Sequence, residues 1–144
     1  MKILGHPLHL MLVHFPSALL PADLVLSAIA WGRQDIVFAT AGFFCLIGGV
    51  VAGWAAVITG FADMLTIRQN KVAMNAALWH GMINGGCLTG FTLLAFRAWN
   101  AYPLTTLPTI KMLVVKGVIV FLLFAGNFLG GKLILKHHIG IEHE

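Results

Sequence analysis

The sequence has very little charge. Only 10% of its 144 residues are Asp, Glu, Lys or Arg, whereas soluble domains carry about 25%. Hydrophobic residues make up 59% of the chain, and the mean hydropathy is +0.91. So little polar surface excludes a water-soluble globular domain. The composition indicates an integral membrane protein that is almost entirely membrane-embedded.

Other features are also scarce. The two cysteines, Cys45 and Cys87, lie in the middle of apolar segments, which argues against a disulfide framework. The nine Lys and Arg are scattered singly, as interface anchors are, so no nucleic-acid partner is expected. Because the chain has no nucleophile–base pattern, phosphate-binding loop or Cys-x-x-Cys motif, hydrolytic and phosphoryl-transfer chemistry have no support.

Four windows are long and apolar enough to cross a bilayer, which takes about 20 residues. They are Leu8–Trp31, Val37–Leu65, Val72–Trp99 and Ile110–Lys136, and polar or breaker residues separate them. We interpret the first as a retained helix and not a signal peptide, because its basic leader is a single Lys2. We find no internal sequence repeat. The sequence predicts one domain over residues 1–144, an all-α integral membrane four-helix bundle with up-and-down topology.

Histidine is the abundant polar residue of this chain. In an up-and-down bundle all seven histidines gather at the membrane face where the first helix begins, here called face A, with face B opposite. They are His6, His9, His14, His80, His137, His138 and His143. An ionisable residue inside a membrane is a functional hypothesis by default, because it loses its water partners there.

Depth along the helices predicts which histidines meet. At a rise of about 1.5 Å per residue, His14 would lie about 9 Å beyond the start of the first helix, and His80 about 12 Å beyond the start of the third. His9 and His137 would be shallower. We therefore predict a deep pair, His14 with His80, and a shallow pair, His9 with His137, for which His6 is the substitute.

Glycines recur along three of the four predicted helices. The second window carries Gly42, Gly49, Gly53 and Gly60, and the third and fourth carry further small-residue patterns. Such patterns are typical of close helix packing, and they also predict a homodimer. A flat macrocycle inside a bundle needs faces without side chains too, and haem iron takes axial imidazoles from facing helices. Histidines with glycine stripes therefore favour buried haem b, one or two per chain.

Two further residues join this site. His80, Asn84 and Cys87 fall on one face of the third helix, at positions i, i+4 and i+7, so Asn84 is expected at the cofactor. Asp63 ends the glycine stripe of the second helix and is expected to bond an imidazole N–H or to lie beside a haem propionate.

Other readings stay open at this stage. Zinc or copper could bind to the same histidines, for example through His14, His80, His137 and Asp63, in a metal-binding or transport protein. A proton or ion path could be lined by Asp23, His14 and His80. The histidines could also simply bond one another or helix carbonyls. Asp23 itself is expected either to be protonated or to extend towards face B with Lys111 or Arg97 as its partner, with no catalytic role.

The residues Gly5-His6-Pro7-Leu8-His9 and Val13-His14-Phe15-Pro16 resemble the signature of a bacterial family of small four-helix membrane proteins, filed as a domain of unknown function. Thr59 to Asp63, His80 and the segment from Gly130 to His137 match it as well. The chain departs from the family pattern at Leu10, where a second proline is usual, and at His138, where glycine commonly follows. Some members are joined to Rieske-type iron–sulfur domains, which implies electron transfer.

Together these features predict a membrane-embedded b-type cytochrome working in electron transfer. Its partners would be the lipid bilayer and a quinone or a redox protein. An enzymatic activity, if the chain has one, would be that of a haem-dependent oxidoreductase. The expected location is the bacterial inner membrane, as a multi-pass protein with face A cytoplasmic, because Lys and Arg are slightly more numerous at that face.

Overall fold

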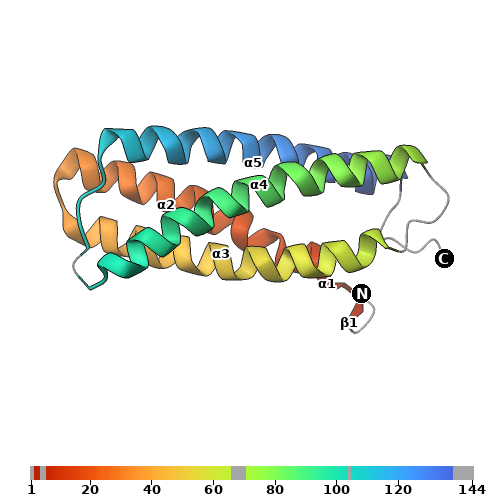
Figure 1. Ribbon diagram of the computed structural model, residues 1–144, viewed down its shortest axis with the longest axis horizontal. Helices are drawn as coiled ribbons and strands as arrows, with labels where there is room; N and C mark the ends of the chain where they lie inside the picture. Colours follow the sequence, from red (N-terminus) through yellow and green to blue (C-terminus); the bar gives the residue numbers. More distant parts are fainter. Residues whose placement is uncertain (1, 4–5, 66–70, 104, 138–144) are drawn as a thin grey trace.

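The computed structural model describes residues 2–3, 6–65, 71–103 and 105–137, with side chains described for 8–65, 71–103 and 105–132. Four long helices lie side by side, and successive ones run in opposite directions (Figure 1). The predicted all-α, up-and-down four-helix bundle is confirmed. In chain order the elements are β1 (Lys2–Ile3), β2 (His6–Pro7), α1 (Leu8–Leu12), α2 (His14–Arg33), α3 (Ile36–Met64), α4 (Lys71–Ala101) and α5 (Ile110–His137).

The first predicted span is made of two helices, α1 and α2, with a one-residue interruption at Val13. Pro16 explains the break, because it has no N–H to donate to the carbonyl of Leu12 one turn earlier. The short strands β1 and β2 pair antiparallel just before α1.

The turn between α2 and α3 is built from local capping. Gln34 ends α2 in the left-handed conformation, with φ of 54°. The Asp35 carboxylate then accepts the backbone N–H of Val37 at 2.9 Å and caps α3. A tight turn of this kind holds the two helices antiparallel, as the polar residues after Trp31 predict.

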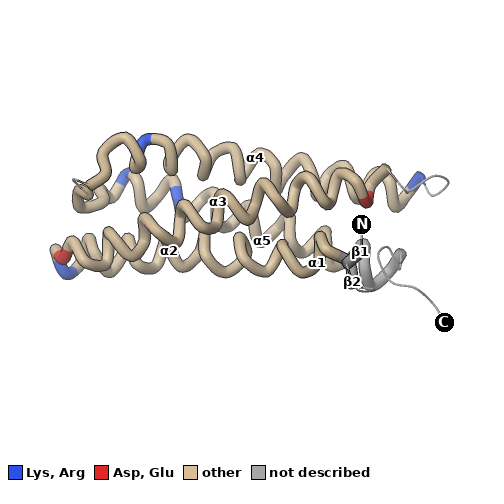
Figure 2. The backbone as a smooth tube through the Cα atoms, turned by 90° about the horizontal axis from the view of Figure 1, so that it is seen from below, with Lys and Arg blue, Asp and Glu red and all other residues tan. Residues whose placement is uncertain are grey.

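The helices present an apolar surface to their surroundings. By length and composition three segments qualify as membrane spans, Leu8–Arg33, Ile36–Met64 and Ile110–Lys132. The chain is therefore a membrane protein surrounded by lipid. The charged positions gather towards the two ends of the bundle, and a long central stretch has none (Figure 2). Phe121 and Ile58 have exposed fractions of 72% and 69%, values that suit contact with lipid and not with water.

Helix α4 is the fourth predicted span, but it is not among the three segments that qualify by length and composition. Its 31 residues are long enough to cross, since a helix of this length extends about 46 Å. It is less apolar because Asn75, His80, Asn84 and several glycines interrupt it. His80 and Asn84 belong to the site described below, so the lower hydropathy of α4 comes partly from the residues that line the bundle interior.

The hydrophobic core lies between the helix pair α2 and α3 and the helix pair α4 and α5. Its buried members are Leu20, Leu46, Val50, Cys87, Leu88, Phe91, Ala95, Val120 and Leu123. The glycine stripe of α3 lets two of these leucines approach the helix backbone. A Cβ at Gly49 would stand 2.6 Å from Leu20 Cδ2, and one at Gly53 would stand 2.6 Å from Leu88 Cδ1. Close helix packing therefore accounts for the middle of the stripe.

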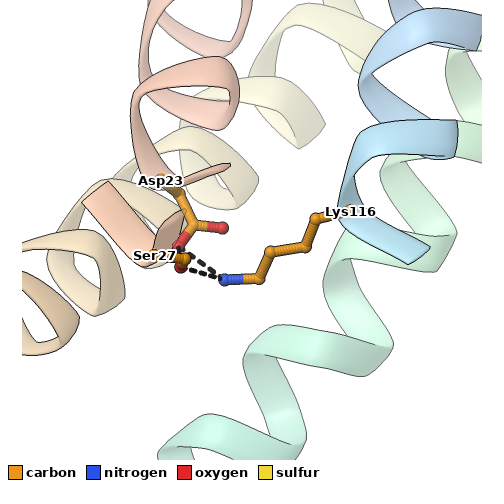
Figure 3. Close-up of polar contacts among 3 residues, drawn as sticks. All are labelled: Asp23, Ser27 and Lys116. Carbon is orange, nitrogen blue, oxygen red and sulfur yellow. Dashed lines mark hydrogen bonds and ion pairs between the residues drawn. The ribbon is translucent and has the colours of Figure 1, made fainter. Parts of the chain in front are cut away.

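A buried ion pair joins α2 to α5. Lys116 Nζ donates to Asp23 Oδ1 at 2.7 Å and to Ser27 Oγ at 2.9 Å, and Ser27 Oγ donates to the same carboxylate oxygen at 3.2 Å (Figure 3). Asp23 is 0% exposed and Lys116 is 4% exposed. The sequence-based expectation of Lys111 or Arg97 as partner was wrong. Lys111 and Arg97 are exposed near the helix ends, whereas Lys116 lies deeper in the bundle, within reach of Asp23.

Breaking this pair on one side should destabilise the bundle. Lys116→Met leaves a buried carboxylate alone, which costs about 3–5 kcal/mol. The double variant Asp23→Leu, Lys116→Met removes both charges and should recover most of that loss, because apolar residues of similar volume replace buried ion pairs well. Thermal unfolding in detergent measures the stability of the single and the double variant. Equal stability of the single variant and the native protein would contradict a buried, mutually dependent pair.

Candidate functional site

A cavity of about 690 Å³ opens inside the face A half of the bundle. We call it the histidine cavity, because His9, His14 and His80 line it together with Asp63 and Asn84. Glycine contributes much of the remaining wall, at Gly53, Gly60, Gly81, Gly85, Gly130 and Gly131. The face A ends of the glycine stripes therefore border one shared space. Its floor is apolar and includes Leu20, Leu88 and Leu123.

His9 is held against α3. Its Nδ1–H donates to the carbonyl oxygen of Ala56 at 2.8 Å. The ring lies over Gly60, where a Cβ would come within 2.7 Å of His9 Cε1 and 2.8 Å of Nδ1. Gly60 is one helical turn beyond Ala56, so its missing side chain is the one that would cover the carbonyl.

His80 is held against α5 in the same way. Its Nδ1–H donates to the carbonyl oxygen of Gly126 at 2.8 Å. The ring lies over Gly130, where a Cβ would come within 2.6 Å of His80 Cε1 and 2.8 Å of Nδ1. Gly130 is again one turn beyond the residue that supplies the carbonyl.

The bundle thus uses one arrangement twice: a histidine, a carbonyl on the helix of the next membrane crossing, and a glycine one turn further along that helix. The two histidines are separated from their carbonyl residues by 47 and 46 residues. No repeat is visible in the sequence, because the residues around the two arrangements differ. Ala56 corresponds to Gly126, for example, and the two halves share only the approximate spacing from the histidine to the carbonyl residue. The structure shows the repetition directly.

These hydrogen bonds fix the tautomer of both rings. A carbonyl oxygen can only accept, so the proton of each neutral imidazole resides on Nδ1. Nε2 of His9 and of His80 therefore carries the lone pair. Metal-ligating histidines commonly have this second bond from the other ring nitrogen to a main-chain carbonyl, which fixes ring orientation and raises ligand basicity.

Asn84 orders the ring of His80. Its amide lies one turn after His80 on α4, 3.1 Å from His80 Nδ1, and packs against Gly126. The atom placed at this distance is Asn84 Nδ2, and Asn84 Oδ1 is buried without a hydrogen-bond partner among the described residues. Because Nδ1–H already donates to the carbonyl, two donors would face each other, so the reversed amide, with Oδ1 accepting from that N–H, is the orientation that satisfies both groups. The predicted shared face of α4 therefore brings Asn84 to the site, as a neighbour of the imidazole.

The His9 and His80 rings lie close together at the histidine cavity, nearly perpendicular to one another. Their centroids are 6.4 Å apart and their planes are inclined by 85°. This pairing differs from both predicted pairs, His14 with His80 and His9 with His137. His14 lines the same cavity but is exposed, and the ring near His80 belongs to His9.

Depth explains the difference. The prediction assumed that all helices begin at the same depth in the membrane. In the structure His9 lies beside Ala56, which is eight residues, or about 12 Å, before the end of α3. His80 is nine residues, about 13.5 Å, from the start of α4. The two rings are therefore at matched depth. His14 follows His9 by five residues, which turns it away around the helix axis by about 140°.

The remaining predicted residues are placed as follows. Asp63 lines the cavity near the end of α3, but main-chain carbonyls, and not its carboxylate, accept the Nδ1–H bonds of His9 and His80. His6 lies in β2 and His137 ends α5, with side chains outside the described residues, and His138 and His143 lie outside them altogether.

Sequence reasoning missed the carbonyl partners and one polar bridge. Asn127 Nδ2 donates to Ser17 Oγ at 3.1 Å, which joins α5 to α2 at the cavity wall. The sequence signal for the carbonyl partners was the nearly equal spacing from His9 to Gly60 and from His80 to Gly130. Among the residues with described side chains, no three His, Cys, Asp or Glu come together as a metal-binding group.

Comparison with known proteins gives one match. The family model described as a predicted membrane protein, DUF2231, matches residues 5–143. No curated protein and no solved structure matches the chain. The match covers nearly the whole bundle, including all the residues of the histidine cavity. The chain therefore belongs to the DUF2231 family of membrane proteins.

Proposed function

We propose that this protein is a membrane-embedded b-type cytochrome in which His9 and His80 hold one haem b from opposite faces. The observation that carries the proposal is the separation of the two rings, 6.4 Å between centroids. A metal–imidazole bond is about 2.0 Å and the ligating nitrogen lies about 1.2 Å from its ring centroid, so two imidazoles on opposite sides of one metal have centroids about 6.4 Å apart.

The same separation disfavours a tetrahedral ion. Two imidazoles on a tetrahedral zinc would have centroids about 5 Å apart, and zinc would need two more ligands. The described acids and thiols do not gather around the two rings in such a group. Zinc or copper remains an alternative occupant, and the experiment below distinguishes it.

The walls support a planar occupant. Helices α4 and α5 present Gly81, Gly85 and Gly131 to the cavity, and a Cβ at each would meet nothing within 4 Å, so these positions would let a flat macrocycle approach the helix backbone. A volume of about 690 Å³ lies within the range of sites for cofactors of this size. The apolar floor suits the hydrocarbon edge of haem.

Bound haem would supply one-electron chemistry, and the protein would supply its setting. The carbonyls of Ala56 and Gly126 keep Nε2 of both histidines unprotonated, and Asn84 restrains one ring. Leu20, Leu88 and Leu123 exclude water from the floor. Imidazoles on both faces leave no open iron position, which favours electron transfer over substrate turnover. The electron partner would be a quinone or a redox protein at the bacterial inner membrane.

The purified protein should carry haem through His9 and His80. Its reduced absorption spectrum should have a sharp Soret band and split visible bands, as two axial imidazoles produce. His9→Ala and His80→Ala should each lose most of the bound haem, because each leaves an axial position empty. The matched variant His14→Ala, at the same cavity, should keep it.

Haem loss with His14→Ala but not with His9→Ala would favour the pair predicted from depth and contradict the one proposed here. A colourless preparation that contains stoichiometric zinc or copper would reject the cytochrome assignment altogether. Haem extraction and metal analysis of the same sample separate these cases.

Glycine at the two ring contacts should be required for the site. Gly60→Ala and Gly130→Ala place a methyl within 2.7 Å and 2.6 Å of the imidazoles, so they should displace the rings and sharply reduce haem content. Gly86→Ala and Gly117→Ala are the controls, because a Cβ there meets nothing within 4 Å. Haem per protein measured by pyridine extraction gives the comparison. Equal loss in all four variants would indicate general helix sensitivity instead of a ring contact.

A further inference from the structure

The ion pair of Asp23 and Lys116 is not used by the proposed site. Neither residue, nor Ser27, lines the histidine cavity. Buried charges at hydrocarbon depth are rare, and most mark a pathway for protons, ions or substrates. A purely structural contact between α2 and α5 would not need charge, since Leu20 and Leu123 already pack in the core that these helices share.

The two oxygens of the Asp23 carboxylate differ in their hydrogen bonding. Its Oδ1 accepts from both Lys116 and Ser27, whereas its Oδ2 is buried without a hydrogen-bond partner among the described residues. An unpartnered carboxylate oxygen in a low-dielectric interior is costly, and a proton bound there removes the cost. Oδ2 is therefore a vacant proton-binding position beside a fixed positive charge.

Lys116 connects this position to one membrane face. It is six residues, about 9 Å, from the start of α5. A lysine at that depth commonly extends its side chain to the nearest interface. Here the side chain turns inward to Asp23 instead (Figure 3). Lys116 therefore marks face B as the nearer membrane face of the buried pair.

Few other ionisable groups face the pair. On α3 the nearest residue is Gly42, where a Cβ would stand 3.1 Å from Asp23 Oδ1, and the titratable side chains of that helix are Cys45 and Asp63. Towards face B, α4 contributes Arg97 and α5 contributes Lys111, and both are exposed. In the described part of the chain, the polar contacts of Asp23 are those with Lys116 and Ser27.

We propose that Asp23 and Lys116 form a redox-linked proton-binding site, loaded from face B. The inference rests on the proposed function. When the bundle gains one electron from a donor such as dithionite, one proton leaves face B water, an O–H bond forms at Asp23 Oδ2, and Lys116 stays an ammonium. Electron and proton charges then cancel inside a bilayer that has no counterions to screen them.

The test compares proton uptake on reduction. The native protein and the double variant Asp23→Asn, Lys116→Met are reduced with dithionite under weak buffering, and a pH indicator reports the protons bound per haem. The double variant leaves no unpaired buried charge, so it is expected to fold and keep the Soret band. Asp35→Ser is the control acid at face B, since serine preserves the helix cap.

The native protein and Asp35→Ser should each bind about one proton per electron, and the double variant should lose that uptake. A protonated-carboxyl band should also appear in the reduced-minus-oxidised infrared spectrum of the native protein and be missing from the double variant. Unchanged uptake in the double variant, with haem bound, would overturn this proposal alone. A native preparation without haem would overturn this proposal and the proposed function together.

Discussion

The site depends on one interaction, the donation of an imidazole N–H to a main-chain carbonyl of a neighbouring helix. In hydrocarbon an imidazole needs a partner for its proton, and the helix backbone offers acceptors only where side chains leave them uncovered. Glycine one turn beyond the acceptor uncovers it, at Gly60 for Ala56 and at Gly130 for Gly126. The bond satisfies the proton, sets the tautomer and aims the ring.

The repeated arrangement also explains how a small bundle can hold two rings against each other. Each histidine is anchored to the last helix of its own half, His9 to α3 and His80 to α5, so both halves contribute to the wall of the cavity. The core leucines and the Asp23–Lys116 pair hold the two halves together below the cavity. The rings can therefore keep their spacing without contacting one another through a hydrogen bond.

Much of the fold could be predicted from the sequence, because hydrophobic windows and polar turns depend on local composition. The first span, the turn before Asp35 and the interior face of α4 are examples. The ring pairing could not be predicted, since depth counted from assumed helix starts ignores where each helix begins and how each residue is rotated. His14 was paired with His80 from predicted depth alone. Helix α1 begins deeper in the bundle than was assumed, so His9 lies beside His80 instead. The partner of Asp23 was missed for a similar reason, because Lys116 turns away from the interface that it could reach.

The angle between the rings offers the most direct test of the central claim, that His9 and His80 together bind a single iron. Their planes are inclined by 85°, and perpendicular axial imidazoles give oxidised haem a strongly anisotropic low-spin signal in electron paramagnetic resonance. The account predicts that signal in the purified oxidised protein. A high-spin signal, or the rhombic low-spin signal of parallel imidazoles, would contradict it.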